Sequence, residues 1–284
     1  MTLAPLIHGY GDPTIRAGAS GIWRATGTPI GPAVQHLRQD NNGIHMRAWG
    51  DGAAWLADRL PVLVGANDVL DDFPNVVPIV TELVRRHEGL RIPCTQAVWE
   101  SLVPAILEQK VTGTEAHASF RALHRTLGER APRVENAPLL MFPLAPAVVV
   151  GTPSHVFHAA NVERKRSDTI RRCASYARRL EECAELTISE AHRRLQSLPG
   201  IGAWTSAEVA IRALGDADAV SVGDFHLKNL VAWNLASQPR GTDEQMLELL
   251  EPFRPHRGRV LLLLQLGGAH APRFGPRLTI QKRW

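Results

Sequence analysis

The chain has 284 residues, of which 44% are hydrophobic and 21% charged, and its formal net charge is +4. This composition is typical of a globular protein long enough for two domains, and the mild basic balance permits a polyanionic partner without requiring one. The three cysteines, Cys94, Cys173 and Cys183, form neither a CxxC pair nor a four-thiolate cluster, which excludes zinc and iron–sulfur centres built on cysteine.

Two features bear on where the chain resides. The first residues, MTLAPLIHGYGDPT, have no basic segment followed by an apolar run, so we expect no signal peptide. The apolar run Val260–Leu266 is too short to span a membrane, and the sparse, odd number of cysteines favours a reducing compartment. We therefore expect a cytoplasmic monomer, associated with the nucleoid if the source is bacterial, with no membrane partner.

Residues 1–90 are rich in Gly, Pro, Asn and Asp. Within them, residues 21–25 and 43–49 alternate roughly with period two, as half-buried strands do, and Asn42-Gly43 is a hairpin signal. One helix is expected over residues 53–60. We predict a small β-rich N-terminal domain that ends near residue 90.

From Pro93 onward the apolar residues recur at helical spacing, and no strand is expected. Residues 136–154 are Pro-rich and irregular, which predicts a covered connection or short helices joined by loops. The predicted fold class is therefore α+β, a β-rich domain followed by an all-α domain over residues 91–284. The predicted helices cover residues 95–107 with Thr95 as cap, 114–127 closed by Gly128, 167–180, 189–198 with Ser189 as cap, 203–214, 224–236, 244–250 and 257–266.

Basic residues gather in two places. Seven lie between Arg164 and Arg179, and we interpret them mainly as a solvated helix face. From Pro252 to the end there are seven Arg or Lys and no Asp or Glu, which is consistent with phosphate contacts along a duplex. A solvated tail explains the last two of them equally well. This second group comprises Arg254, Arg257, Arg259, Arg273, Arg277, Lys282 and Arg283.

The segment Leu198-Pro199-Gly200-Ile201-Gly202 joins two of the predicted helices. Its glycines permit positive φ angles and remove side chains, so that backbone N–H groups can point outward. Together with the partial positive charge at the start of the next helix, such a turn suits a phosphate group. A plain joint between two helices, with no ligand, fits the same five residues equally well.

With Asp224, this turn resembles the helix-hairpin-helix superfamily of base-excision DNA glycosylases, which is named for its hairpin, a Gly/Pro-rich loop and an aspartate. Residues 199–206 (PGIGAWTS) are most similar to the 3-methyladenine DNA glycosylase II branch. In that branch a Trp follows the hairpin and the catalytic Asp comes 20 positions later, as Asp224 follows Trp204. Residues 107–112 (LEQKVT) are similar to that branch's segment of a Gln followed by a wedge residue.

The resemblance covers about residues 93–268 and implies two helical subdomains with a cleft between them. It places the hairpin over about residues 189–214, and the branch's β-rich N-terminal domain matches residues 1–90 in outline.

The resemblance implies that Asp224 is the catalytic carboxylate. It would stabilise the positive charge that develops on the sugar as the N-glycosidic bond breaks, and would orient or deprotonate the attacking water. Asp is also a favoured helix N-cap, a role compatible with catalysis. Trp204 stands where strand-cleaving members carry a nucleophilic Lys. Because a Trp forms no Schiff base, we expect hydrolysis by water without strand cleavage.

The same resemblance assigns a base pocket. Trp204 would stack on the extruded base, with a core Trp as the alternative. Glu208 and His256 stand where this branch presents aromatic walls, so the pocket is more polar than in the relatives, or else both are surface residues. Asp224-Phe225-His226 lacks a third convergent ligand, so no metal site is expected. The predicted base pocket comprises Trp204, Gln109, Glu208, His256 and Phe225.

Contacts to DNA are expected from the hairpin and from two basic side chains. Lys110 departs from the usual apolar wedge, and a solvent-facing pair at a helix end is the alternative for Gln109 and Lys110. No cofactor is expected, although the resemblance allows a monovalent cation at the hairpin. The predicted DNA-binding residues are Pro199, Gly200, Ile201, Gly202, Ala203, Thr205, Lys110 and Arg257.

The predicted function is that of a base-excision-repair glycosylase. It would flip a damaged base, an alkylated purine, out of double-stranded DNA and hydrolyse its N-glycosidic bond. A first alternative, suggested by Glu208 and His256, is a glycosylase for oxidised or deaminated bases. A second is a non-catalytic module that uses the hairpin to bind damaged DNA.

Overall fold

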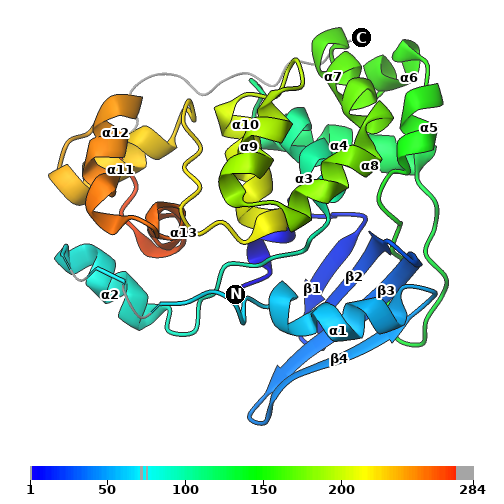
Figure 1. Cartoon of the computed structure of the whole chain (residues 1–284), viewed down its shortest axis with the longest axis horizontal. Coiled ribbons are helices and arrows are strands. Elements are labelled where there is room, and N and C mark those ends of the chain that lie inside the picture. Colours follow the sequence, from blue (N-terminus) through cyan, green and yellow to red (C-terminus); the bar gives the residue numbers. More distant parts are fainter. Residues whose placement is uncertain (1, 71–72, 75, 273–284) are drawn as a thin grey trace.

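The computed structural model describes residues 2–70, 73–74 and 76–272 of the chain. Arg273, Arg277, Lys282 and Arg283, which close the predicted basic run, lie outside the described residues. Within the described part, no helix is long and apolar enough to cross a membrane. A small antiparallel sheet and a larger helical body make up the molecule (Figure 1), so the predicted α+β fold class is confirmed.

The sheet has four antiparallel strands in the order β1-β2-β3-β4. The two predicted strand segments are confirmed within β2 and β4. The predicted hairpin signal lies at the β3–β4 turn, where Asp40 pairs with Gly43 and the glycine has a φ of +129°. This angle favours glycine. The strands are β1 (Ile15–Gly18), β2 (Gly21–Thr28), β3 (Gly31–Asp40) and β4 (Gly43–Trp49), preceded by the 3-10 turn η1 (Ala4–Leu6) and followed by α1 (Ala53–Leu63).

One face of the sheet is covered by a segment from the helical body. Trp23 stacks on His36 and Trp49, with ring centroids 4.1 Å and 5.6 Å apart, and packs in one apolar cluster with Leu140 and Phe142. Leu140 and Phe142 come from the Pro-rich connection that follows α4 (Gly113–Leu127). Part of that connection is therefore buried against the sheet. Its second half forms the short helices that were the other predicted possibility, α5 (Pro146–Gly151) and the start of α6 (Ser154–Ala159).

A single carboxylate also ties the sheet to the helices. Glu100 lies in α3 (Val98–Leu107) and accepts hydrogen bonds at 2.7 Å from Arg24 Nη2, Thr26 Oγ1 and the Gly27 backbone N–H, all in β2. Every residue of α3 except Glu100 is buried. Glu100, the one residue of α3 that is not buried, thus joins the helical body to the sheet.

The first helical cluster packs around α3 and contains the hairpin. The predicted helices at 114–127, 189–198 and 203–214 are present, whereas the one predicted over 167–180 is divided in two. Its helices are α4, α5 (Pro146–Gly151), α6 (Ser154–Ala159), α7 (Arg164–Ser175), α8 (Ala177–Glu181), α9 (Ile188–Gln196) and α10 (Ala203–Val209), with a 3-10 turn at Glu182–Glu185 and a π turn at Ala210–Leu214.

The predicted cap at Thr95 is wrong. α3 begins three residues later. The backbone N–H groups of Val98 and Trp99, its first two residues, donate at 2.8 Å to the two carboxylate oxygens of Glu181 in α8. A carboxylate that is 83 residues away along the chain takes the place of a local cap. Tertiary packing decides such a cap, and local sequence does not show it.

The predicted cap at Ser189 is also wrong. The N-cap of α9 is Thr187, whose hydroxyl accepts from the Glu190 backbone N–H while the Glu190 carboxylate accepts from Thr187. This reciprocal capping box satisfies two helix N–H groups and is preferred over a lone serine.

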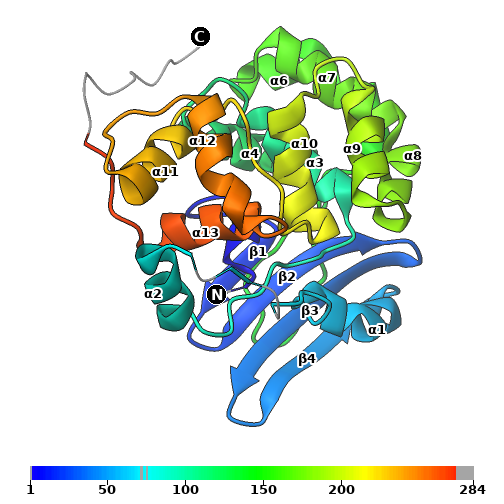
Figure 2. The ribbon, with the colours of Figure 1, turned by 60° about the vertical axis from the view of Figure 1, so that its left-hand side comes forward.

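The second helical cluster lies beside the first (Figures 1 and 2). It contains α2, which was not predicted, and three helices from the end of the chain. α2 packs with these helices, although it precedes residue 90, where the N-terminal domain was predicted to end. The domain boundary at residue 90 remains a prediction. The helices are α2 (Pro78–Arg86), α11 (Leu227–Ala236), α12 (Asp243–Leu250) and α13 (Arg257–Gly267), with a 3-10 turn at Glu251–Phe253.

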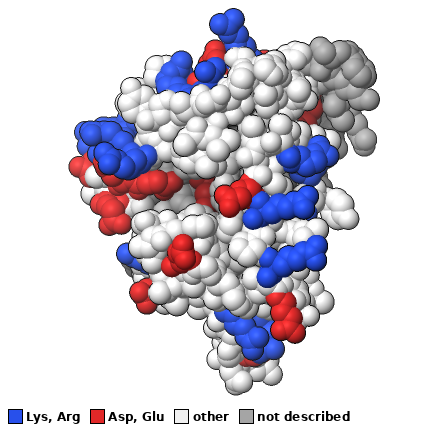
Figure 3. All heavy atoms as spheres, turned by 90° about the vertical axis from the view of Figure 1, so that its right-hand side faces the viewer, with Lys and Arg blue, Asp and Glu red and all other residues white. Residues whose placement is uncertain are grey.

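The basic residues between Arg164 and Arg179 only partly form a solvated face. Arg164, Arg178 and Arg179 are exposed, but Arg166 is buried and donates to the Leu107 carbonyl at 2.6 Å. On the side of the molecule shown in Figure 3, positive and negative side chains are interspersed. That side therefore presents no field of a single sign.

Candidate active site at the helical hairpin

The loop between α9 and α10 is tightly folded. The Ile201 backbone N–H donates to the Leu198 carbonyl at 3.0 Å, and the Ile201 side chain is buried in the first helical cluster. Gly200 has a φ of +97°, and a Cβ there would lie 2.8 Å from Thr169 Cγ2 and would collide with the Thr169 hydroxyl. Gly202 is exposed with open space around it. Only the first of these two glycines is required by the packing.

Two side chains from elsewhere in the chain hold the loop. Arg172 of α7 donates to the Pro199 carbonyl at 2.7 Å. Gln109, just after α3, donates from Nε2 to the Gly200 carbonyl at 3.0 Å and to Thr205 Oγ1 at 2.8 Å. Gln109 therefore braces the hairpin, and the buried Thr205 hydroxyl lies beneath the loop as its partner.

Trp204 and Asp224 meet beside the hairpin. The indole Nε1–H donates to Asp224 Oδ2 at 3.1 Å. Asp224 Oδ1 accepts from the backbone N–H groups of His226 at 2.7 Å and Leu227 at 3.0 Å. The following helix starts at Leu227, three residues after the predicted start, but the Asp224 carboxylate still caps its first turn. Three N–H donors thus hold a half-buried carboxylate in one orientation.

Glu208, one turn beyond Trp204, is committed to other partners. Its Oε2 pairs with Arg212 Nη1 at 2.5 Å, and its Oε1 accepts from the Ser221 hydroxyl. Arg212 in turn donates from Nε to the Pro5 carbonyl at 2.9 Å. The carboxylate predicted for the base pocket is therefore part of a network that reaches the N-terminal segment.

The two remaining predicted pocket residues, His256 and Phe225, differ in their surroundings. His256 is 6% exposed and its ring centroid lies 5.4 Å from that of Phe73, in the second helical cluster. Phe225 is 68% exposed and meets the ring of His226 edge-on at 5.0 Å. Of the five predicted pocket residues, Trp204 is the one that contacts Asp224 through a hydrogen bond.

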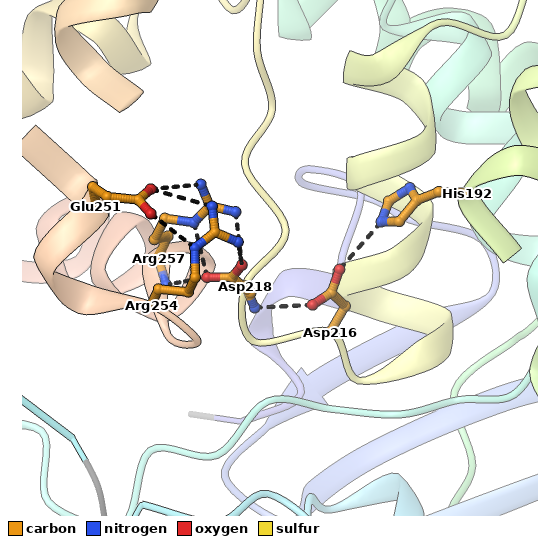
Figure 4. Close-up of polar contacts among 6 residues, drawn as sticks. All are labelled: His192, Asp216, Asp218, Glu251, Arg254 and Arg257. Atoms are coloured by element: carbon orange, nitrogen blue, oxygen red, sulfur yellow. Dashed lines mark hydrogen bonds and ion pairs between the residues drawn. The ribbon is translucent and has the colours of Figure 1, made fainter. Parts of the chain in front are cut away.

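The described members of the C-terminal basic run are paired with acidic residues. Arg257 donates from Nη2 and Nε to the two oxygens of Asp218 at 2.7 Å and 2.9 Å, and only 14% of its side chain is exposed. Arg254 contacts both Asp218 and Glu251 (Figure 4). The basic run contains no acidic residue of its own, because Asp218 and Glu251, which pair with it, both precede Pro252 in the chain.

Arg259 is the most buried member of that run. Its side chain is 2% exposed and forms an ion pair with Asp68, so it lies in the interior and not at a surface where a phosphate could reach it. Lys110, by contrast, is exposed, and its φ of +56° places it in the left-handed region of a turn between α3 and α4.

A second set of polar contacts near the hairpin was not predicted. His192 of α9 contacts Ser206 Oγ at 2.5 Å through Nδ1 and Asp216 Oδ2 at 3.2 Å through Nε2. The other Asp216 oxygen accepts from the Asp218 backbone N–H at 2.9 Å (Figure 4). Ser206 is fully buried, so the arrangement positions the hairpin helices and offers no nucleophile to a substrate.

Glu108 lies immediately before Gln109. Burial by itself would raise the pKa of this carboxyl, but the neighbouring His117 and His8 side chains and the Arg212 charge hold its pKa well below its usual range. Glu108 is therefore an anion next to the residue that braces the hairpin.

Comparisons with known proteins agree with this geometry. No protein-family model matches the chain. A probable bifunctional transcriptional activator/DNA repair enzyme AlkA of Mycobacterium tuberculosis is 31% identical over 153 residues, which are 53% of this chain and 30% of that protein. DNA-3-methyladenine glycosylase 2 of Escherichia coli is 28% identical over 179 residues, covering 61% of this chain and 59% of that protein. The chain therefore spans less than two thirds of these relatives.

Solved structures match over almost the whole chain. The 3-methyladenine DNA-glycosylase of Archaeoglobus fulgidus has a TM-score of 0.73 at 17% identity, covering 93% of this chain and 90% of that one. The Clostridium acetobutylicum 8-oxoguanine glycosylase/lyase in complex with double-stranded DNA has a TM-score of 0.68 at 12% identity, with 89% and 86% covered. The chain therefore has the fold of these DNA glycosylases. In sequence it is similar to relatives named as an AlkA DNA repair enzyme and a 3-methyladenine glycosylase.

Proposed function

We propose that this chain is a helix-hairpin-helix base-excision DNA glycosylase that hydrolyses the N-glycosidic bond of an alkylated purine and leaves the strand intact. The observation that carries the proposal is the hydrogen bond from Trp204 to Asp224, beside a hairpin braced by Gln109. A fixed carboxylate and a large aromatic ring are together the chemistry that removal of a positively charged base requires.

In this proposal the hairpin holds the DNA backbone. Gly202 and Ala203 are exposed at the start of α10, where helix N–H groups have no intrahelical partner and suit a phosphate. Gln109 holds the loop from behind, and the exposed Lys110 that follows it enters the duplex or contacts a phosphate. Arg257 would reach DNA only by giving up Asp218.

The proposed chemistry depends on the groups that donate hydrogen bonds to the two carboxylate oxygens of Asp224. Backbone N–H groups at the start of α11 and the indole of Trp204 hold the carboxylate in one orientation before the substrate arrives. The charge then stabilises the developing oxocarbenium ion, and the carboxylate orients the attacking water. Trp204 offers no amine, so no covalent intermediate forms with the sugar and the product is an abasic site.

The proposal favours an alkylated base over an oxidised or deaminated one. The rival relied on Glu208 and His256 as polar pocket walls, but Glu208 is bonded to Arg212 and Ser221, and His256 packs in the second helical cluster. A pocket without those polar groups selects a base by stacking and charge, which suits a cationic lesion.

The deciding experiment measures free base released from duplexes that carry a methylated purine, hypoxanthine, uracil or 8-oxoguanine. We expect release of the methylated purine, no strand cleavage and no borohydride-trapped adduct. Asp224→Asn should bind the duplex and release no base, while Asp168→Asn, which removes a half-buried charge on α7, should act like wild type. Unchanged release by Asp224→Asn would remove Asp224 from the mechanism, and binding without release by the wild type would favour the non-catalytic module.

A further inference from the structure

We propose that His8, Glu108 and His117 form a zinc site that ties the N-terminal segment to the turn between α3 and α4. The three side chains come from separate parts of the chain: the loop after η1, the end of α3 and the first turns of α4. Their potential ligand atoms all lie within 4.8 Å of one another. The site is distinct from the Asp224 centre and does not depend on the glycosylase proposal.

The spacing fits a shared ion better than it fits direct hydrogen bonds. His8 Nδ1 and His117 Nε2 lie 3.5 Å and 3.7 Å from the same oxygen of Glu108. A good hydrogen bond between nitrogen and oxygen is about 2.7–3.2 Å long. Ligand atoms bound at about 2.05 Å around a tetrahedral zinc ion are about 3.4 Å apart. Shifts of a few tenths of an ångström would bring both histidines to that separation from Glu108.

The donor set selects the class of metal. Two imidazoles and one carboxylate are ligands that Zn²⁺ commonly takes, often with water in the fourth position. Ca²⁺ and Mg²⁺ prefer sites built from oxygen alone. The side chains of His8, Glu108 and His117 are 10%, 19% and 30% exposed, so the site is mostly enclosed but opens at His117. That opening leaves an entry path and room for a fourth ligand.

The backbone around the cluster is shaped to hold it. Gly9 has a φ of +74°, and a Cβ there would collide with the His117 ring, 2.8 Å from its Cγ. The His8 backbone N–H donates to Asp12 Oδ2 at 2.7 Å, which fixes the segment that carries His8. The nearby Arg212 charge is neutralised by Glu208. A side chain at position 9 would push His117 out of the cluster.

A bound ion would stiffen the turn that serves the hairpin. Glu108 is followed directly by Gln109, which donates to the Gly200 carbonyl, and by the exposed Lys110. Zinc at Glu108 would therefore fix the end of α3 against the N-terminal segment and against α4. The role of the ion is structural, because the cluster offers no contact to Asp224.

The test is a zinc titration of the full chain after treatment with a chelator. Competition with a chromophoric chelator should show one Zn²⁺ per chain, and zinc at a hundredfold excess over Kd should raise Tm by about 5 °C. Both effects should disappear in His117→Ala, which alters a partly exposed side chain, and in Glu108→Gln. Circular dichroism of the metal-free variants should show the helical spectrum of the metal-free wild type.

The matched control removes the histidines His155 and His158, both exposed on α6. A pair three positions apart on a helix can bind zinc at a surface, so this double alanine variant should keep the one-to-one stoichiometry and the Tm rise. Zinc binding that survives both His117→Ala and Glu108→Gln, or that vanishes in the α6 variant alone, would overturn the proposal. So would the absence of zinc binding by the wild type.

Discussion

The indole N–H of Trp204 donates a hydrogen bond to Oδ2 of Asp224 across 3.1 Å. The sequence suggested a separate role for each residue. Trp204 stands where strand-cleaving relatives carry a lysine, and Asp224 was predicted to be the catalytic carboxylate. In the structure they form one unit, because the indole of Trp204 donates a hydrogen bond that helps to orient the Asp224 carboxylate. The spacing of 20 residues between them is bridged by the π turn and the loop that precede α11.

We expect Trp204→Phe to slow base release by about 10- to 100-fold, because a hydrogen bond to a charged group contributes about 1.5–3 kcal/mol. Single-turnover rates of base release would show the effect. An unchanged rate would mean that the indole hydrogen bond does not contribute to base release, and Trp55→Phe on α1 is the matched control.

The two glycines of the hairpin should differ in tolerance. Gly200→Ala places a Cβ against Thr169 at a φ of +97°, so we expect a loss of about 1–3 kcal/mol in the free energy of unfolding. Gly202→Ala meets open space and should cost less than about 1 kcal/mol, chiefly through a poorer N-cap. Urea denaturation of both variants measures the difference. Equal losses would show that the Thr169 contact does not constrain the loop.

Stability should depend on pH through Glu181, which caps α3. Burial raises the pKa of Glu181 to about 7 from an ordinary value of 4.5, against the opposing effect of the Trp99 and Val98 N–H groups. Because the folded pKa lies above the unfolded one, the contribution of this group is full below pH 4.5 and is lost as the pH rises to about 7.

Glu181→Gln carries no charge at any pH. Relative to wild type, it should therefore gain about 2–4 kcal/mol between pH 4.5 and pH 8, as urea denaturation at several pH values would show. Glu190→Gln provides a control of opposite sign, because hydrogen bonds from Thr187 lower the pKa of the exposed Glu190. There the wild type should gain relative to the variant as the pH rises through the acid range.

The buried pair of Asp68 and Arg259 should be sensitive to loss of one partner. Asp68→Ala leaves a guanidinium that is 2% exposed without its carboxylate, and we expect a cost of about 3–5 kcal/mol. Replacing both residues, as Asp68→Ala with Arg259→Met, should recover part of that loss. Glu82→Ala at an exposed pair on α2 should cost less than about 1 kcal/mol. A small effect of Asp68→Ala alone would show that solvent reaches Arg259.

Much of the fold could be predicted because its signals are local. Period-two alternation marked β2 and β4, helical spacing marked most helices after Pro93, and the Pro-Gly-Ile-Gly turn marked the hairpin. The predictions were wrong where a local sequence signal was overridden by another interaction. Ser189 yielded to the capping box of Thr187 with Glu190, and α2 was missed because its short apolar stripe has meaning only against α13.

The sequence by itself determined the turn and the spacing from Trp204 to Asp224, because these depend on neighbours along the chain. Only the tertiary structure decided which charges are paired. Arg257 meets Asp218, Glu208 meets Arg212, and the histidines at positions 8 and 117 converge on Glu108. These contacts depend on how helices and loops that are distant in the sequence pack together, and no periodicity in the chain encodes them.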